Sequence, residues 1–136
     1  MTQPGPNIAE VLKQAKTIAV VGLSADPSRP SHVVSRYMQA HGYRIIPVNP
    51  KYASVLNEPC YPKLTQIPPS THVDIVNIFR RPETVLPIVE EAIQIGAKGI
   101  WMQEGVVHTR AAEKARRAGL WVVMDRCIFQ DHSRYV

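Results

Sequence analysis

The sequence has no apolar run that approaches the ~20 residues needed to cross a bilayer. Residues 1–7 also lack the charged and apolar regions of a signal peptide. We therefore expect a cytoplasmic protein that does not act at a membrane. No repeat, low-complexity tract or shift in composition divides the 136 residues. A single domain over 1–136 is expected, long enough to bury an ordinary hydrophobic core.

Cysteine is scarce, with only Cys60 and Cys127, which lie far apart and outside any C-x-x-C spacing. Structural zinc requires four nitrogen or sulfur ligands in short paired spacings, and the five histidines are dispersed. The sequence thus predicts no metal site, and in a cytosolic protein it predicts reduced thiols. No cysteine or serine is paired with a histidine at a recognisable catalytic spacing, so no catalytic residue is predicted.

The sequence has few acidic residues. The chain carries 11 acidic against 16 basic residues, a net charge of +5, which favours an anionic partner. Nucleic-acid binding would require clustered basic residues with interleaved aromatic rings. Here the basic residues are scattered, and only Arg80–Arg81 and Arg116–Arg117 are adjacent. The expected partner is a small anionic molecule and not a nucleic acid, while a protein partner is possible but unidentified.

Strand and helix patterns alternate along the chain. Strands are predicted over 17–22, 44–49, 73–79, 99–102 and 120–125, and helices over 8–16, 31–40, 82–95 and 109–118. The segment 50–69 holds five of the 12 prolines and is expected to be a loop with a short edge strand near 59–61. This alternation predicts an α/β fold, a mostly parallel, doubly wound sheet of about five strands with helices on both faces.

In such a sheet, ligands bind beyond the carboxyl ends of the strands. Gly22, Leu23 and Ser24 follow the first strand, and Gly22 permits a sharp turn or a close backbone approach. Ser31 is predicted to cap the next helix, whose N–H groups, together with Arg29 and the two serine hydroxyls, suit a pyrophosphate. The loop has a single glycine, so the G-x-G-x-x-G pattern is absent. The alternative is that this strand–loop–helix unit is purely structural and binds no ligand.

The second predicted strand ends in Asn49, Pro50 and Lys51, and no acidic residue occurs between Asp26 and Glu58. An NAD site places a carboxylate on the ribose 2′-hydroxyl about 20 residues after its glycines. An asparagine and a lysine suit a ribose phosphate better than a free diol. The alternative is that Lys51 is an ordinary exposed loop lysine.

The strand that ends at Phe79 runs directly into Arg80 and Arg81, just before a predicted helix. Two guanidinium groups beside a helix N-terminus make a strong anion site if both point inward. Alternatively, one of them pairs with Glu83 or Glu104 at the surface. We expect at most one of the two arginines to contact the ligand.

Gln103, Glu104 and Gly105 follow the next strand. Gly105 permits close backbone approach, and Gln103 is suited to hydrogen-bond an amide-rich ligand. Glu104 is a conceivable general base or an ion-pair partner of an arginine. At the last strand end, Arg126 is placed to favour a Cys127 thiolate, so an NADP-type or thiol-dependent acyl-transfer enzyme using Cys127 is the alternative function.

Together, several blocks of the sequence resemble the small stand-alone CoA-binding domain proteins, relatives of the CoA-binding Rossmann domain of succinyl-CoA synthetase α subunits. The matching blocks are V-V-G-L-S at 20–24, P-S-R-P-S at 27–31, G-Y-R-I-I-P-V-N-P-K at 42–51, V-D-I-V-N-I-F-R-R-P at 73–82, A-I-Q-I-G-A-K-G-I-W-M-Q-E-G at 92–105 and V-V-M-D-R-C at 122–127. They occur in order over nearly the whole chain after residue 16.

The resemblance implies a Rossmann-like domain with coenzyme A, or an acyl-CoA, across the carboxyl edge of the sheet. It places the loop at 22–29 on the pyrophosphate and the turn at 49–51 near the adenosine and its 3′-phosphate. Residues 79–81 would flank the adenosine and phosphates, and 103–105 would follow the pantetheine. The synthetases phosphorylate a histidine of another domain that this chain lacks, so their ligase activity does not carry over. A non-enzymatic binding, sensing or carrier module is expected, with an interaction domain whose pocket is empty as a further alternative.

Overall fold

The computed structural model describes residues 5–136, which form one small α/β domain around a five-stranded sheet. All strand pairs of this sheet are parallel, and the strand order is β2-β1-β5-β6-β7. The strands are β1 (Thr17–Val21), β2 (Arg44–Val48), β5 (Ile75–Ile78), β6 (Gly99–Met102) and β7 (Trp121–Val123). The predicted parallel, Rossmann-like sheet is confirmed.

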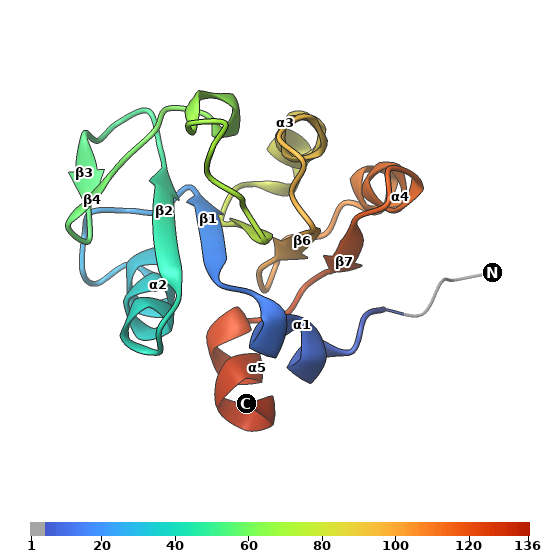
Figure 1. The fold of residues 1–136 in the computed structure, drawn as a ribbon, viewed down its shortest axis with the longest axis horizontal. Coiled ribbons are helices and arrows are strands. Elements are labelled where there is room, and N and C mark those ends of the chain that lie inside the picture. Colours follow the sequence, from blue (N-terminus) through green and yellow to red (C-terminus); the bar gives the residue numbers. More distant parts are fainter. Residues whose placement is uncertain (1–4) are drawn as a thin grey trace.

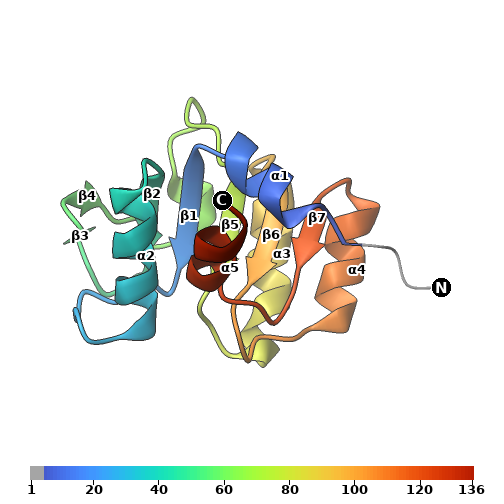
Figure 2. The same ribbon diagram turned by 90° about the horizontal axis from the view of Figure 1, so that it is seen from below.

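Helices cover both faces of the sheet (Figures 1 and 2). On one face lie α3 (Val85–Gln94) and α4 (Thr109–Arg117), and on the other lie α1 (Ile8–Gln14), α2 (Pro30–Ala40) and α5 (Ile128–Tyr135). Successive strand residues point to opposite faces. In β1, for example, Ile18 and Val20 pack in the α1–α2–α5 core, whereas Ala19 and Val21 pack in the α3–α4 core. Burial on both faces explains why the strands are continuous apolar runs.

The start of α2 differs from the prediction. Arg29, not Ser31, is the N-cap, and Pro30 occupies the first helical position, where its missing N–H leaves no hydrogen bond unmade. Ser31 lies inside the first turn, and its Oγ accepts the backbone N–H of Ser24 at 3.0 Å. The serine therefore fixes the preceding loop instead of capping the helix. As predicted, the helix is followed by Gly42, which has a φ of 92°.

The C-terminal part of the chain forms a helix that we did not predict. The last strand ends at Val123, two residues earlier than expected, and α5 begins at Ile128 with Cys127 as its N-cap. Between them, Asp125 adopts a left-handed backbone conformation with φ of 61°. This turn brings the C-terminal helix back over the α1–α2 face of the sheet (Figure 2).

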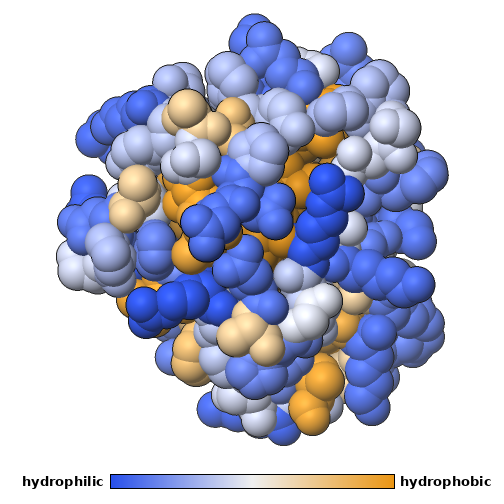
Figure 3. Space-filling view, turned by 60° about the vertical axis from the view of Figure 1, so that its left-hand side comes forward, coloured by the Kyte–Doolittle hydropathy of each residue, from blue (hydrophilic) through white to orange (hydrophobic). Residues whose placement is uncertain are grey.

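The proline-rich segment contains a small hairpin, and the edge strand expected near 59–61 is reduced to a single parallel bridge between Tyr61 and Val48 of β2. The strands of the hairpin, β3 (Ser54–Val55) and β4 (Glu58–Pro59), are antiparallel, and Leu56 and Asn57 both have positive φ in the turn between them. The surface on this side is largely hydrophilic, with hydrophobic residues visible between polar side chains (Figure 3). Within residues 5–136, no helix combines the length and apolar character that spanning a membrane requires.

Candidate functional site

A cavity of about 660 Å3 opens at the carboxyl edge of the sheet. The chain moves outward from β1 to β2 and then crosses back to β5, so the loops after β1 and β5 diverge. Crevices at such a switch in strand order are the usual ligand sites of open α/β sheets, and the volume falls within the ~300–1,000 Å3 typical of ligand pockets. The lining residues are Gly22, Ser24, Arg29, Pro30, Ser31, Val34, Asn49, Lys51, Tyr52, Phe79, Arg80, Arg81, Pro82, Gln103, Glu104, Gly105, Val106 and Cys127.

Gly22 determines how closely the loops after β1 and β5 approach each other. Its φ is 91°, and a Cβ at this position would lie 2.2 Å from the carbonyl oxygen of Phe79. Its N–H donates to the carbonyl of Val48 at 2.8 Å, which also ties the loop to β2. A side chain here is thus excluded by the protein itself, independently of any ligand.

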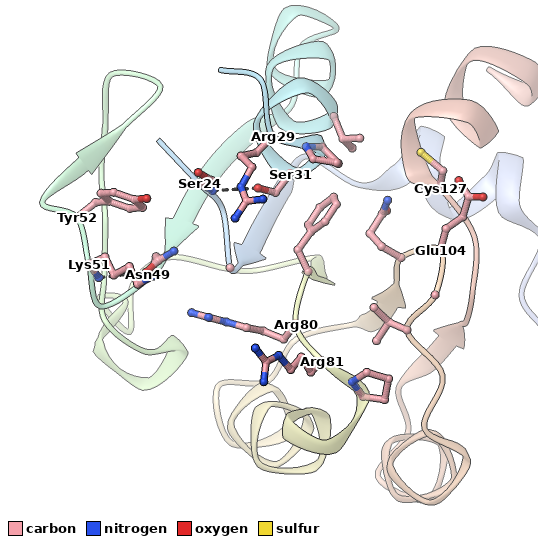
Figure 4. Close-up of a pocket in the computed structure, with 18 residues that line it drawn as sticks. Ser24, Arg29, Ser31, Asn49, Lys51, Tyr52, Arg80, Arg81, Glu104 and Cys127 are labelled. Carbon is pink, nitrogen blue, oxygen red and sulfur yellow. Dashed lines mark hydrogen bonds between the residues drawn. The ribbon is translucent and has the colours of Figure 1, made fainter. Parts of the chain in front are cut away.

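The rest of the first loop is fixed by short-range hydrogen bonds. The Ser24 hydroxyl accepts the N–H of Asp26, and a ring nitrogen of His32 lies 2.9 Å from the Ser24 carbonyl. Hydrogen bonds from the Ser28 N–H and hydroxyl lower the pKa of Asp26 below its ordinary value. These contacts present Arg29 at the cavity wall, as Figure 4 shows.

The turn after β2 is organised by the side chain of Asn49, which is 6 % exposed. Its Nδ2 donates to the Leu23 carbonyl at 3.1 Å, and its Oδ1 accepts the Lys51 N–H at 3.0 Å. The amide therefore joins two loops and places Lys51 at the cavity. The Leu23 side chain is fully buried and does not line this cavity, and Pro50 lines an adjoining cavity of about 510 Å3.

The charge around the cavity is strongly asymmetric. Arg29, Lys51, Arg80 and Arg81 contribute four cations, and Glu104 contributes the one carboxylate of the lining. In the part of the chain that the structure describes, none of these five residues forms an ion pair, so the alternative pairing of an arginine with Glu83 or Glu104 is not observed. Arg80 also lines the adjoining cavity. Unpaired cations around a cavity attract anionic ligands.

The far wall is formed by the turn after β6. Gly105 has a φ of 84°, and its N–H donates to Asp125 Oδ1 at 2.8 Å. Gln103 is 4 % exposed, and its Oε1 accepts the Ile128 N–H at 3.0 Å. The turn after β6 is therefore connected to the beginning of α5, which explains why Cys127 reaches the cavity.

The Arg126 guanidinium, which the sequence suggested as a neighbour favouring a Cys127 thiolate, is paired with a carboxylate. Its Nε and Nη2 donate to the two carboxylate oxygens of buried Asp131 at 2.7 and 2.8 Å. This paired hydrogen bonding raises the pKa of Arg126 further above its ordinary value. The guanidinium thus serves to fix the first turn of α5. Within residues 5–136, no group of three or more His, Cys, Asp or Glu side chains is arranged to hold a metal ion.

All the predicted site residues except Leu23 and Pro50 line the same cavity. The lining also includes residues that the prediction left out: Pro30, Val34, Tyr52, Pro82, Val106 and, as a binding-site residue, Cys127. Tyr52 and Pro82 directly follow predicted segments, so extending each segment by one residue would have included them. The place of Val34 in the lining depends on how α2 packs, and nothing in its local sequence distinguishes it. Cys127 was predicted only as the thiol of the alternative enzyme, at the last strand end.

Residues 16–133 match the protein family described as "CoA binding domain". The chain belongs to this family. It is 42% identical over 126 residues to the uncharacterized protein YneT of Bacillus subtilis, covering 93% of this chain and 92% of that protein. An acetate–CoA ligase (ADP-forming) of Archaeoglobus fulgidus is 27% identical over 129 residues, and the match spans 88% of this chain but only 18% of the ligase.

Solved structures agree with the fold of this family member. A hypothetical protein from Pyrococcus horikoshii superimposes with a TM-score of 0.90 at 38% identity, covering 99% of both chains. A dinucleotide-forming acetyl-coenzyme A synthetase of Ca. Korarchaeum cryptofilum gives a TM-score of 0.69 at 24% identity, with 81% of this chain matched to 26% of that one. The similarity to this synthetase shows that the two proteins share a fold.

Proposed function

We propose that this protein binds coenzyme A, or an acyl-CoA, across the carboxyl edge of its sheet as a non-enzymatic binding, sensing or carrier module. The observation that carries the proposal is the charge of the cavity, with four cations facing one carboxylate at the switch in strand order. CoA combines a pyrophosphate with a 3′-phosphate, and it therefore suits this excess of positive charge. Membership of the CoA binding domain family supports the same ligand.

The orientation of the ligand follows from where the charges lie. Figure 4 shows Lys51 on one side of the cavity, Cys127 and Glu104 on the other, and Arg29 and Arg80 between them. We assign the 3′-phosphate to Lys51, because β2 ends without the carboxylate that would hold a free ribose diol. The pyrophosphate then lies near Ser24, Arg29 and the start of α2. The pantetheine extends toward the turn after β6.

The test is calorimetric titration of CoA, dephospho-CoA, NAD and NADP. CoA should bind most tightly, with affinity falling tenfold or more (about 1.4 kcal/mol) when the 3′-phosphate is absent. Lys51→Ala should cost about 1–2 kcal/mol toward CoA and abolish the preference over dephospho-CoA. Lys13→Ala removes the same charge from an exposed position of α1 and should change neither affinity.

Two results would contradict the proposal. Binding to none of the four compounds would mean that the fold persists without this ligand. Tighter binding of NADP than of CoA would favour the NADP-type alternative. Equal CoA affinity in wild type and Lys51→Ala would remove only the assignment of the 3′-phosphate to Lys51.

Acyl transfer to Cys127 is a second candidate, because the structure places this thiol in the cavity wall. Transfer would leave the acyl group on the Cys127 sulfur as a thioester and release CoA with a free thiol. Incubation with acetyl-CoA followed by intact mass spectrometry tests it. An acetyl adduct that is absent from Cys127→Ser would support transfer, and an unmodified wild-type protein would exclude it for this acyl group.

A further inference from the structure

Cys127 is the N-cap of α5 and lies on the opposite side of the cavity from Lys51 (Figure 4). The residues on either side of the thiol are fixed by the fold. The Arg126 guanidinium is bound to both oxygens of Asp131, and the Arg126 carbonyl accepts the indole N–H of Trp101 at 2.8 Å. Trp101 is fully buried, so this hydrogen bond connects the turn directly to the core. The thiol therefore has a defined position in the cavity wall.

Gln103 provides an independent indication of what this end of the cavity accepts. It is 4 % exposed and lines the cavity, and its side-chain Oε1 accepts a hydrogen bond from the Ile128 N–H. Among residues 5–136, no acceptor is bound to its Nε2. An amide group with free N–H donors inside a cavity suits a ligand that carries carbonyl oxygens. The pantetheine arm of CoA carries two amide carbonyls shortly before its terminal thiol.

Cys60 shows how different the environment of Cys127 is. The Cys60 thiol donates to the Asn49 carbonyl at 3.3 Å, burial raises its pKa, and it does not line the cavity. Cys127 is half-buried and faces the cavity, with no hydrogen bond to its sulfur among the described residues. Both cysteines are half-buried, but of the two only Cys127 lines the cavity, whereas the Cys60 thiol is hydrogen-bonded to the backbone.

Resting on the CoA-binding function proposed above, we infer that Cys127 forms a reversible mixed disulfide with the thiol of CoA. The oxidant is CoA disulfide. The Cys127 thiolate attacks one sulfur of the bound CoA disulfide, a Cys127–CoA disulfide forms, and the other CoA leaves as a thiolate that takes up the proton lost by Cys127. A second free thiol, such as that of glutathione, reverses the step by the same exchange. The cavity would then hold CoA covalently under oxidising conditions and by non-covalent contacts under reducing conditions.

The experiment incubates the reduced protein with CoA disulfide and follows its intact mass. Wild type and Cys60→Ser should each gain a single CoA that dithiothreitol removes, and Cys127→Ser should gain none. Because binding raises the effective concentration of the reacting thiol, CoA disulfide should react roughly tenfold or more faster than glutathione disulfide. Lys51→Ala should slow the reaction with CoA disulfide and leave the reaction with glutathione disulfide unchanged.

Calorimetry with CoA on the same samples separates this inference from the proposed function. CoA binding without an adduct on wild type would overturn the disulfide and leave the binding function intact. An adduct on Cys127→Ser equal to that on wild type, or equal rates with both disulfides, would also overturn it, because the reaction would then not be directed by the cavity. Absence of both CoA binding and adduct would overturn the function and the inference together.

Discussion

At the scale of single residues, the sequence is most informative where the backbone demands a particular residue. Gly22 was predicted to lie where the backbone turns sharply or approaches a ligand, and its φ of 91° confirms the turn. The space of a Cβ is taken by the Phe79 carbonyl of the protein itself. Polar side chains are harder to predict. The sequence predicted Asn49 as a ligand contact, yet its side-chain amide donates a hydrogen bond to the carbonyl of Leu23, which is 26 positions away. Such pairings depend on how the loops meet in space.

Gly22→Ala tests the backbone argument. Alanine at this position would have to adopt a left-handed backbone conformation, and its methyl group would clash with the Phe79 carbonyl. We therefore expect a loss of roughly 2–5 kcal/mol in the free energy of unfolding. Gly42→Ala is the matched control, since Gly42 has a φ of 92° but no atom within 4 Å of the added Cβ. Its cost should be about 1–2 kcal/mol, from the backbone alone. Urea denaturation measures both, and equal losses would show that the contact with Phe79 is unimportant.

At the scale of elements, the apolar helices and strands were predictable and α5 was not. Its buried positions are Ile128, Asp131 and His132, so only one of the three is apolar. Two of its polar side chains have partners outside the helix, one just before it in the chain and one distant. Arg126 binds Asp131, and the Tyr37 hydroxyl on α2 lies 2.8 Å from His132 Nδ1. Tyr37 lies 95 positions from His132, so local sequence does not reveal this partner. Cys127 was predicted at the last strand end only as the thiol of the alternative enzyme, and its place in the cavity lining depends on the packing of α5.

The contact between α2 and α5 should make stability depend on pH. Burial, and then the nearby His41, lower the pKa of His132 in the folded protein. The unfolded chain therefore binds more protons in the interval from this lowered pKa up to about 6.5, and the free energy of unfolding should fall as the pH decreases through that interval. His132→Gln should reduce the slope, as measured by urea denaturation at a series of pH values between about 5 and 7.

The control for this prediction is His72→Gln, which alters an exposed histidine in the loop before β5. It should keep the pH dependence of the wild type. If His132→Gln also kept that dependence, the loss of stability at acidic pH would have to arise from other groups and not from the buried His132.

At the scale of the whole molecule, the alternation of strand and helix patterns was sufficient to predict a parallel sheet and the edge at which the cavity lies. That edge follows from the chain direction, because the carboxyl ends of all parallel strands meet there. The strand order and the shape of the cavity required the structure. The loops after β1, β2, β5 and β6 and the start of α5 converge on one cavity, whose lining is spread from residue 22 to residue 127.

A ligand held by so many separate segments binds only the folded protein, and it should stabilise the whole domain. By mass action, CoA at 100 times its dissociation constant should raise the free energy of unfolding by about 2.7 kcal/mol. Urea denaturation with and without CoA measures the increase. Dephospho-CoA at the same concentration should give a smaller increase, and Lys51→Ala should respond equally to the two compounds. A denaturation midpoint that CoA does not move, at a concentration where calorimetry shows saturation, would mean that the unfolded chain binds CoA as well, and that the assembled cavity is not what recognises it.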